Sequence, residues 1–462
     1  MEQILEFNEA VNGFVWGPVM LLILVGTGVY LTIRSGVFQV RGFPMAMSTT
    51  IGSVIGRRAK KADEANISGF QAVSTALAST VGTGNVVGVA TAITIGGPGA
   101  VFWMWISAFF GMMTKFAEIV LAMKYRETNV EGRYVGGPMY YIKNGLKQPW
   151  LAYVFAVFAT LATFGIGNMT QANSIATAFE TSFGTPTWLM GVIVMVLTAV
   201  VILGGIKAIA RVTEKLVPFM AVFYIAISIV LLVLHAGQII PSLVLVVHAA
   251  FDPTSALGGA AGYTIAQAIR MGIARGVFSN EAGLGSAPIA HAASNTKEPV
   301  EQGLWGIFEV FVDTLLICTM TALVILTTGV WQGEERGAAL TIAAFNHGLP
   351  GTFGGIALTI GLALFAYSTI LGWSYYGEKS LEFIFRGIGG TRIAIFVYRL
   401  VFVAAVYVGS VGGLHAVWDI SDTLNGLMAI PNLIGVLGLS GVVIAELRSY
   451  LRRRKAGELV AD

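Results

Sequence analysis

The chain has 462 residues, of which 55% are hydrophobic and only 11% are charged, whereas an ordinary soluble domain is about 25% charged. A soluble fold of this size could not cover so much apolar side chain with so few charges, which excludes a soluble multi-domain enzyme. The net charge of +3 does not indicate a nucleic-acid-binding protein, and the single cysteine, Cys318, excludes an internal disulfide. The composition indicates an integral membrane protein.

Apolar runs recur along the chain at the length that spans a bilayer, which is about 20 residues for a helix. The runs are continuous and do not alternate with polar residues, so they predict helices and not the strands of a β-barrel. We therefore expect an all-α integral membrane protein with about eleven transmembrane helices. The predicted spans are residues 14–34, 68–94, 98–123, 151–178, 187–205, 216–235, 262–291, 303–329, 353–378, 393–411 and 421–446.

The positions of lysine and arginine predict the orientation of these spans. If the N-terminus lies outside, most of the 28 Lys and Arg residues fall in the inner segments, and the outer stretch 236–261 contains none. Cytoplasmic loops are enriched in these residues. We predict a multi-pass protein of the plasma (cytoplasmic) membrane with its N-terminus outside and its C-terminus in the cytoplasm.

The second and seventh predicted spans differ from the others, because glycine and polar residues interrupt them at STVGTGN (79–85) and SNEAGLGS (279–286). Glycine lowers the cost of leaving helical geometry, and polar neighbours satisfy the backbone groups that are then freed. The two spans are five apart, so they enter the membrane from opposite sides. Interrupted helices at matching positions of inverted halves indicate the binding site of a secondary transporter. The alternative is that these glycines only let helices pack closely.

Five blocks of sequence extend this pattern along nearly the whole chain: VGTGNVVGVATAITIGGPGAVFWMW (81–105), GIGNMTQANS (165–174), RGVFSNEAGLGSAPIA (275–290), AYSTILGWSYYGEK (366–379) and DTLNGLMAIPNLIG (422–435). Together they resemble the alanine/glycine:cation symporter family, also called sodium:alanine symporters, of the amino acid–polyamine–cation superfamily. The resemblance implies a LeuT-like 5+5 inverted repeat preceded by one extra N-terminal helix. It also implies sodium as the coupling ion, alanine or glycine as the substrate, and no prosthetic group.

This fold divides the chain into five expected segments. They are an N-terminal extra helix with a basic cytoplasmic loop (1–66), a first five-helix repeat (67–235), an extracellular connection (236–261), a second, inverted five-helix repeat (262–447) and a basic cytoplasmic tail (448–462).

The resemblance implies a sodium site beside the first interruption. The carbonyl oxygens of Ala78 and Val81 would face the ion, together with the hydroxyls of Ser368 and Thr369 and the carbonyl of Phe365 in the ninth span. A hard cation of single charge suits such neutral oxygens. The alternative is that the two hydroxyls hydrogen-bond to their own helix.

The backbone amides of Gly82, Thr83 and Gly84 are expected to receive the substrate carboxylate, on the same resemblance. Gln171 in the fourth span is expected to donate to the carboxylate or to line the pocket. The structural alternative for Gln171 is a hydrogen bond between helices, worth about 0.6 kcal/mol on average in membranes.

A bulky side chain is expected to limit the substrate's size. Trp373 lies four residues after Thr369 on the same helix face, where its indole would leave space for glycine or alanine but not leucine. Phe278 would form the opposite wall. The expected substrate-binding residues are Ser79, Gly82, Thr83, Gly84, Gln171, Phe278, Ser279, Thr369 and Trp373.

Charged side chains inside spans predict a gate. Arg270 and Arg275 lie in the outer half of the seventh span, where a cation needs a partner or water, near Asp419 and Asp422 at the outer start of the last span. We expect at least one arginine to pair with one aspartate when the site is closed to the outside. The charged residues of the inner half have two interpretations: counterparts of this gate, or purely structural buried ion pairs. They are the Lys115/Glu118 pair, three residues apart on one helix, Glu281 and Asp313.

Three other functions compete with sodium symport. A proton-coupled transporter of the same fold is the nearest, but the sixth span has a basic residue, Lys215, only at its cytoplasmic edge. A channel would predict a continuous pore, usually with oligomeric symmetry. A membrane enzyme lacks motif support. The five histidines are interpreted as isolated from one another, which also speaks against an enzyme; they are His235, His248, His291, His347 and His415. The sequence leaves open whether alanine or glycine is preferred, and it leaves open the oligomeric state.

Overall fold

The computed structural model describes residues 2–54, 66–252, 264–349, 351–388, 390–412 and 415–458. Almost all of the secondary structure in these ranges is helical. The strands described there are β1 (Glu127–Thr128) and β2 (Tyr134–Val135), which form one short antiparallel pair. The predicted all-α fold class is confirmed.

Eight helical stretches of the described chain are long and apolar enough to cross a membrane. They are Glu6–Ser35, Gly99–Lys124, Pro149–Phe183, Gly205–Leu234, Pro299–Thr327, Phe353–Ile384, Thr391–Val411 and Asp419–Gly438. Each matches one predicted span. The other three predicted spans contain shorter helices, because two of them are interrupted and the fifth forms only the 16-residue α11 (Thr187–Ile202). The total of eleven spans stays a prediction.

The long stretches contain α1 (Glu2–Val15), α2 (Pro18–Ser35), α7 (Gly99–Lys124), α9 (Pro149–Phe164), the π-helix η2 (Gly165–Met169), α10 (Thr170–Phe183), α12 (Gly205–Leu234), α17 (Pro299–Val310), the π-helix η3 (Phe311–Cys318), α18 (Thr319–Thr327), α20 (Phe353–Ile384), α21 (Thr391–Val411) and α22 (His415–Gly438). The connecting helices are α3 (Phe38–Arg41), α4 (Phe43–Val54), α8 (Pro138–Asn144), α13 (Ala236–Phe251), η4 (Val330–Gln332), α19 (Gly337–Gly348) and α23 (Ser440–Lys455).

Helix boundaries differ from the predicted ones at both ends of the chain. Most of the first predicted span, 14–34, forms α2, and a separate helix, α1, lies before α2 in the chain and packs against α22. Pro18 begins α2, since proline suits the first turn of a helix. The last span ends at Gly438, earlier than residue 446, and the basic tail belongs to α23, which begins at Ser440. The connection 236–261 contains α13, and the rest of it from Pro253 onward lies outside the described residues.

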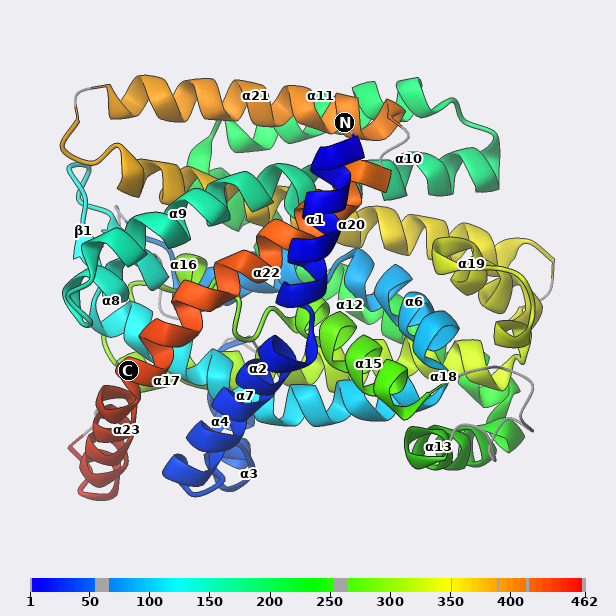
Figure 1. Ribbon diagram of the computed structural model, residues 1–462, viewed down its shortest axis with the longest axis horizontal. Helices are drawn as coiled ribbons and strands as arrows, with labels where there is room; N and C mark the ends of the chain where they lie inside the picture. Colours follow the sequence, from blue (N-terminus) through cyan, green and yellow to red (C-terminus); the bar gives the residue numbers. More distant parts are fainter. Residues whose placement is uncertain are drawn as a thin grey trace.

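The connecting elements gather at two opposite ends of the molecule (Figure 1). β1, α8 and α23, from segments predicted inside, lie at the left end of the view, whereas α13 and α19, from segments predicted outside, lie at the right end. This separation agrees with spans that cross in alternating directions. Which end faces the cytoplasm stays a prediction.

Both interrupted helices begin with the same local motif. At the start of α5 (Gly69–Thr80), Ser68 Oγ accepts from the amide of Gln71 and Gln71 Oε1 accepts from the amide of Ser68, each at 3.1 Å. Thr264 and Gln267 make the same two bonds, also at 3.1 Å, at the start of α15 (Ile265–Asn280). This capping box fixes where a helix begins. The two helices then run for 12 and 16 residues before each stops.

Candidate functional site

The first interruption separates α5, which ends at Thr80, from the short 3-10 helix η1 (Thr83–Asn85) and α6 (Val87–Gly96). The freed amide of Gly82 donates to Asn85 Oδ1 at 2.9 Å. A Cβ atom at Gly82 would overlap the hydroxyl oxygen of Thr369 on α20. Glycine therefore allows α20 to approach the interrupted backbone closely, in a fully buried region.

Five oxygen atoms converge beside this interruption. Thr369 Oγ1 lies 3.1 Å from the carbonyl oxygen of Ala78, 3.5 Å from that of Val81 and 3.0 Å from that of Phe365. Ser368 Oγ lies 3.0 Å from the Ala78 carbonyl oxygen and 2.8 Å from the Phe365 carbonyl oxygen. The structure thus brings together all five residues expected at a sodium site. Both hydroxyls bond to a carbonyl of their own helix, α20, and to a carbonyl of α5. A position at the expected sodium site and hydrogen bonds within the helix are therefore compatible.

The expected carboxylate-binding residues also meet here. The amide of Thr83 points to Gln171 Oε1 at 3.4 Å, and the amide nitrogen of Gln171 donates to a carbonyl in η2 at 2.9 Å. Thr83 Oγ1 is buried without a hydrogen-bond partner among the described residues. A Cβ atom at Gly84 would lie 3.1 Å from Ser279 Cα and 3.2 Å from the Phe278 ring. Residues of the first interruption therefore lie directly against α15.

Ser79 lies apart from this group. Its hydroxyl donates to the carbonyl of Thr75 in its own helix at 3.1 Å, and it packs against Gly372 of α20. Its hydroxyl is therefore at the α5–α20 contact.

The second interruption separates α15, which ends at Asn280, from α16 (Ala287–His291). Glu281, Gly283 and Gly285 all have positive φ angles, of 58°, 94° and 80°. Glycine adopts this backbone region without strain, which explains the two glycines of the sequence SNEAGLGS. Both interruptions predicted from the sequence are present in the structure.

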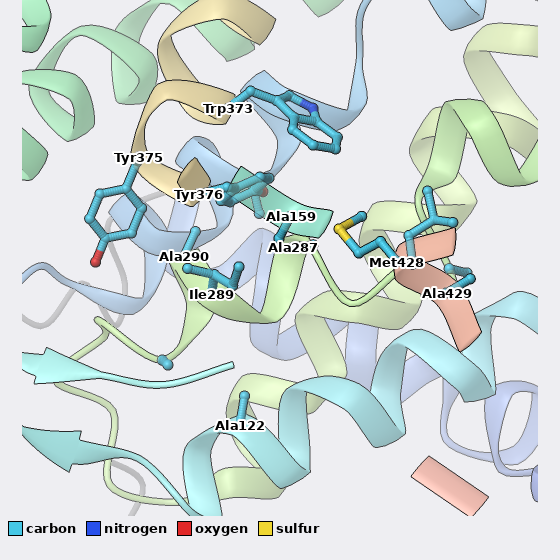
Figure 2. Close-up of a cluster of buried hydrophobic side chains, with 14 of the residues drawn as sticks. Ala122, Ala159, Ala287, Ile289, Ala290, Trp373, Tyr375, Tyr376, Met428 and Ala429 are labelled. Atoms are coloured by element: carbon cyan, nitrogen blue, oxygen red, sulfur yellow. The ribbon is translucent and has the colours of Figure 1, made fainter. Parts of the chain in front are cut away.

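Trp373 contacts both sides of the expected pocket. Its Nε1 donates to Glu281 Oε1 at 3.0 Å, and its side chain lies directly against Gly167 in η2. Its ring centroid is 5.5 Å from that of Tyr376. Figure 2 shows these two rings from α20 in a buried cluster that also contains Met428 of α22. The indole therefore connects the second interruption to the π-helix that precedes Gln171.

Asp313 in η3 connects the two interruptions, a role that was not predicted from the sequence. Its Oδ1 accepts from Asn85 Nδ2 at 2.6 Å and from Ser279 Oγ at 3.1 Å. Cys318 Sγ lies 3.4 Å from each of the same two groups. An acid within an apolar span is itself a signal of function, and π-helical segments occur frequently at functional sites. The sequence shows an acidic residue within this apolar span, but it does not show which residues Asp313 contacts.

The buried charges pair differently from the sequence expectation. Lys115 Nζ lies 3.3 Å from Glu309 Oε1 of α17. Among the described residues Lys115 therefore pairs with Glu309 and not with Glu118. Glu118 instead accepts from the amide of Gly283 at 3.1 Å. His291 Nε2 lies 3.3 Å from the other oxygen of Glu309, so this histidine is not isolated.

One of the expected gate pairs is present. Arg275 Nη2 lies 3.6 Å from Asp422 Oδ2, and the two side chains are 22% and 19% exposed. The Arg275 guanidinium also lies 5.5 Å from the ring centroid of Phe278. Arg270 and Asp419 are exposed. The structure thus places Arg275, and not Arg270, beside the candidate pocket.

Two interrupted helices with polar groups converging between them are the arrangement of a secondary transporter's binding site. The chain belongs to the sodium:alanine symporter family, whose model matches residues 1–461.

Individual relatives agree with this family. The chain is 48% identical to the sodium/alanine symporter AgcS of Methanococcus maripaludis over 97% of each chain, and 46% identical to an uncharacterized transporter of Haemophilus influenzae over 98% of each. Among solved structures it is similar to MhsT in complex with L-phenylalanine, with a TM-score of 0.56 at 15% identity, covering 83% of this chain and 98% of that one. The LeuT-like fold is confirmed. The chain is a multi-pass membrane transporter and not an enzyme.

Proposed function

We propose that this protein is a sodium-coupled symporter of a small neutral amino acid, alanine or glycine. The observation that carries the proposal is the convergence of three carbonyl and two hydroxyl oxygens beside the first interruption, with Thr369 as the common neighbour. Neutral oxygens suit a hard monovalent cation. The carbonyl groups at the C-terminal end of α5 add the negative end of a helix dipole.

The substrate carboxylate would bind on the other side of Gly82. The amides of residues 82–84 precede α6, and a helix N-terminus favours an anion. Because Gly82 packs against Thr369, the ion and the carboxylate would occupy adjacent positions. Each then lowers the cost of binding the other, and this mutual effect is the coupling that symport requires.

Small substrate size follows from the aromatic side chains around the interruptions. Phe278 covers Gly84, and Trp373 fills the space between Gly167 and Glu281. Both side chains are at least nine-tenths buried. An amino acid with a methyl group or a hydrogen as side chain suits this arrangement, whereas a branched side chain would displace one of the rings.

Alternating access would expose the site to one side of the membrane at a time. With the N-terminus outside, as the distribution of basic residues predicts, Arg275 and Asp422 lie on the outer side of the interruptions. Their ion pair would form when the site is closed to the outside, and it would separate when substrate enters.

Uptake into proteoliposomes tests the proposal. The purified chain should accumulate labelled alanine under an inward sodium gradient, and unlabelled alanine and glycine should compete while leucine should not. Protein-free liposomes are the control. If a pH gradient drives alanine accumulation in the absence of sodium, the protein is a proton-coupled transporter and not a sodium symporter. Competition by large amino acids alone would refute the substrate class.

A further inference from the structure

A groove of about 550 Å³ lies outside the transport site, between the segment that follows α2 and the C-terminal helix α23. Its lining combines apolar and basic side chains: Phe38, Met45, Leu451, Arg41, Arg454 and Lys455. α4 and α23 project from the same lower-left corner of the molecule in Figure 1. The groove therefore joins the extra N-terminal segment to the end of the chain, and neither belongs to the expected ten-helix core.

The groove is fixed to the end of a membrane span. Arg41 Nη2 donates at 3.0 Å to the carbonyl of Ser35, the last residue of α2. Tyr30, five residues earlier in α2, contacts Ser440 at the start of α23 at 3.4 Å. Arg41 is therefore held at the end of α2, and the groove brings Arg454 and Lys455 from the last turn of α23 beside it.

Neighbouring cations are neutralised, whereas those of the groove are not. Arg453 forms two bonds to Glu298, at 2.8 and 2.7 Å, and Lys124 pairs with Glu446 at 2.7 Å. Among the salt bridges of the described residues, none involves Arg41, Arg454 or Lys455. The groove therefore presents three positive charges to whatever binds there.

We propose that this groove binds the headgroup of an anionic phospholipid. The charges match a lipid phosphate, and basic pockets at the cytoplasmic ends of spans suit such headgroups. A soluble anion would not use the apolar lining, whereas a lipid places its first carbons against it. Val37 and Val40, close in sequence to the lining residues Phe38 and Arg41, are also exposed, at 41% and 52%, and add apolar side chains to this segment. The bound lipid would hold the N-terminal segment against α23.

Lipid binding to the purified full-length protein in detergent tests this proposal. Phosphatidylglycerol with oleoyl chains is the probe, and phosphatidylcholine with the same chains is the neutral reference, both counted by native mass spectrometry. The variant R41Q/R454Q/K455Q should lose affinity for phosphatidylglycerol by about a hundredfold, because each of the three cations near the surface contributes about fivefold. The variant R211Q/K215Q/R448Q loses the same charge at exposed positions outside the groove and should bind as the wild type does.

Four outcomes would overturn the proposal: unchanged binding in the first variant, an equal loss in the second, equal retention of phosphatidylcholine, or displacement of the lipid by an equal concentration of inorganic phosphate. The charge-preserving variant R41K/R454K/K455R separates electrostatics from folding, since it should keep phosphatidylglycerol within about twofold. If the triple neutral variant unfolds, K455Q alone on the exposed last turn should show about a fivefold loss, and an unchanged affinity there would equally contradict the site.

Discussion

The ammonium of Lys115 and the carboxylate of Glu309 lie 3.3 Å apart, and neither side chain is exposed. Lys115 Nζ also donates to the carbonyl of Asn280, the last residue of α15, at 2.7 Å. Glu309 Oε1 accepts at 2.9 Å from the hydroxyl of Thr80, the last residue of α5. A single buried ion pair therefore connects the C-terminal ends of both interrupted helices.

Replacing Lys115 with methionine should destabilise the protein by about 3–5 kcal/mol, because the buried Glu309 carboxylate then keeps the Thr80 hydroxyl and the His291 imidazole but loses its ammonium partner. Thermal unfolding in detergent measures this change. The double variant K115M/E309Q removes both charges and should recover most of the loss. A double variant no more stable than K115M would show that the pair makes no such contribution.

The proposed sodium site, with its five converging oxygens, predicts how sodium dependence changes when one hydroxyl is removed. Ser368→Ala should raise the sodium concentration for half-maximal alanine uptake by about tenfold or more, since a bond to a charged group is worth about 1.5–3 kcal/mol. Alanine affinity at saturating sodium should change little. Ser410→Ala is the matched control, because Ser410 is also buried and bonds to its own helix, at 3.0 Å from the Val406 carbonyl. A sodium requirement altered equally in both variants would remove Ser368 from the ion site.

Sodium-dependent uptake should require glycine at position 82 but not at position 88. Gly82→Ala would place a methyl group on the Thr369 hydroxyl, between the proposed ion and carboxylate positions. We expect this variant to fold and to lose sodium-dependent uptake. Gly88→Ala, at the second residue of α6, meets no atom within 4 Å and should keep uptake within about twofold and gain helix propensity. Activity in G82A equal to that in G88A would contradict the close approach of α20.

The sequence predicts those features that depend on local chemistry. The glycines and polar residues around Gly82 and Gly283 mark both interruptions, since the cost of leaving a helix is local. The Ser-x-x-Gln pattern at Ser68 and the Thr-x-x-Gln pattern at Thr264 are local signals of the same kind, although we did not predict capping boxes from them. The sodium residues are placed by family resemblance, and the structure brings these residues together.

Partners that are far apart in the chain could not be predicted in this way. Lys115 has Glu118 one turn away on its own helix, but the tertiary structure places Glu309 nearer. His291 was interpreted as isolated because its neighbour in space, Glu309, belongs to another helix. Asp313 could be recognised as unusual, but its contacts with Asn85 and Ser279 depend on how three helices pack.

Two replacements of Trp373 separate its volume from its hydrogen bond. Trp373→Ala should admit larger amino acids such as leucine, because the indole fills the space beside Gly167. Trp373→Phe keeps most of the volume but leaves Glu281 Oε1 without the indole donor, which should cost about 1–3 kcal/mol of stability while substrate selectivity stays narrow. Competition assays and thermal unfolding measure the two effects. An unchanged substrate range in W373A would remove Trp373 from the pocket.

Charge reversal tests the gate function of Arg275 and Asp422. Reversing one partner, in R275D or D422R, puts like charges in the partly buried place of an ion pair whose atoms lie 3.6 Å apart, so each variant should lose most of its uptake. The double variant R275D/D422R restores opposite charges and should recover a substantial fraction. The same reversals at Arg270 and Asp419 should have a smaller effect, because both side chains are exposed and exposed charges interact by about 1 kcal/mol or less. Labelled alanine uptake is the measurement. If R275D/D422R takes up as little alanine as the two single variants, the ion pair does not control access to the site. The loss of uptake would then come from each side chain separately.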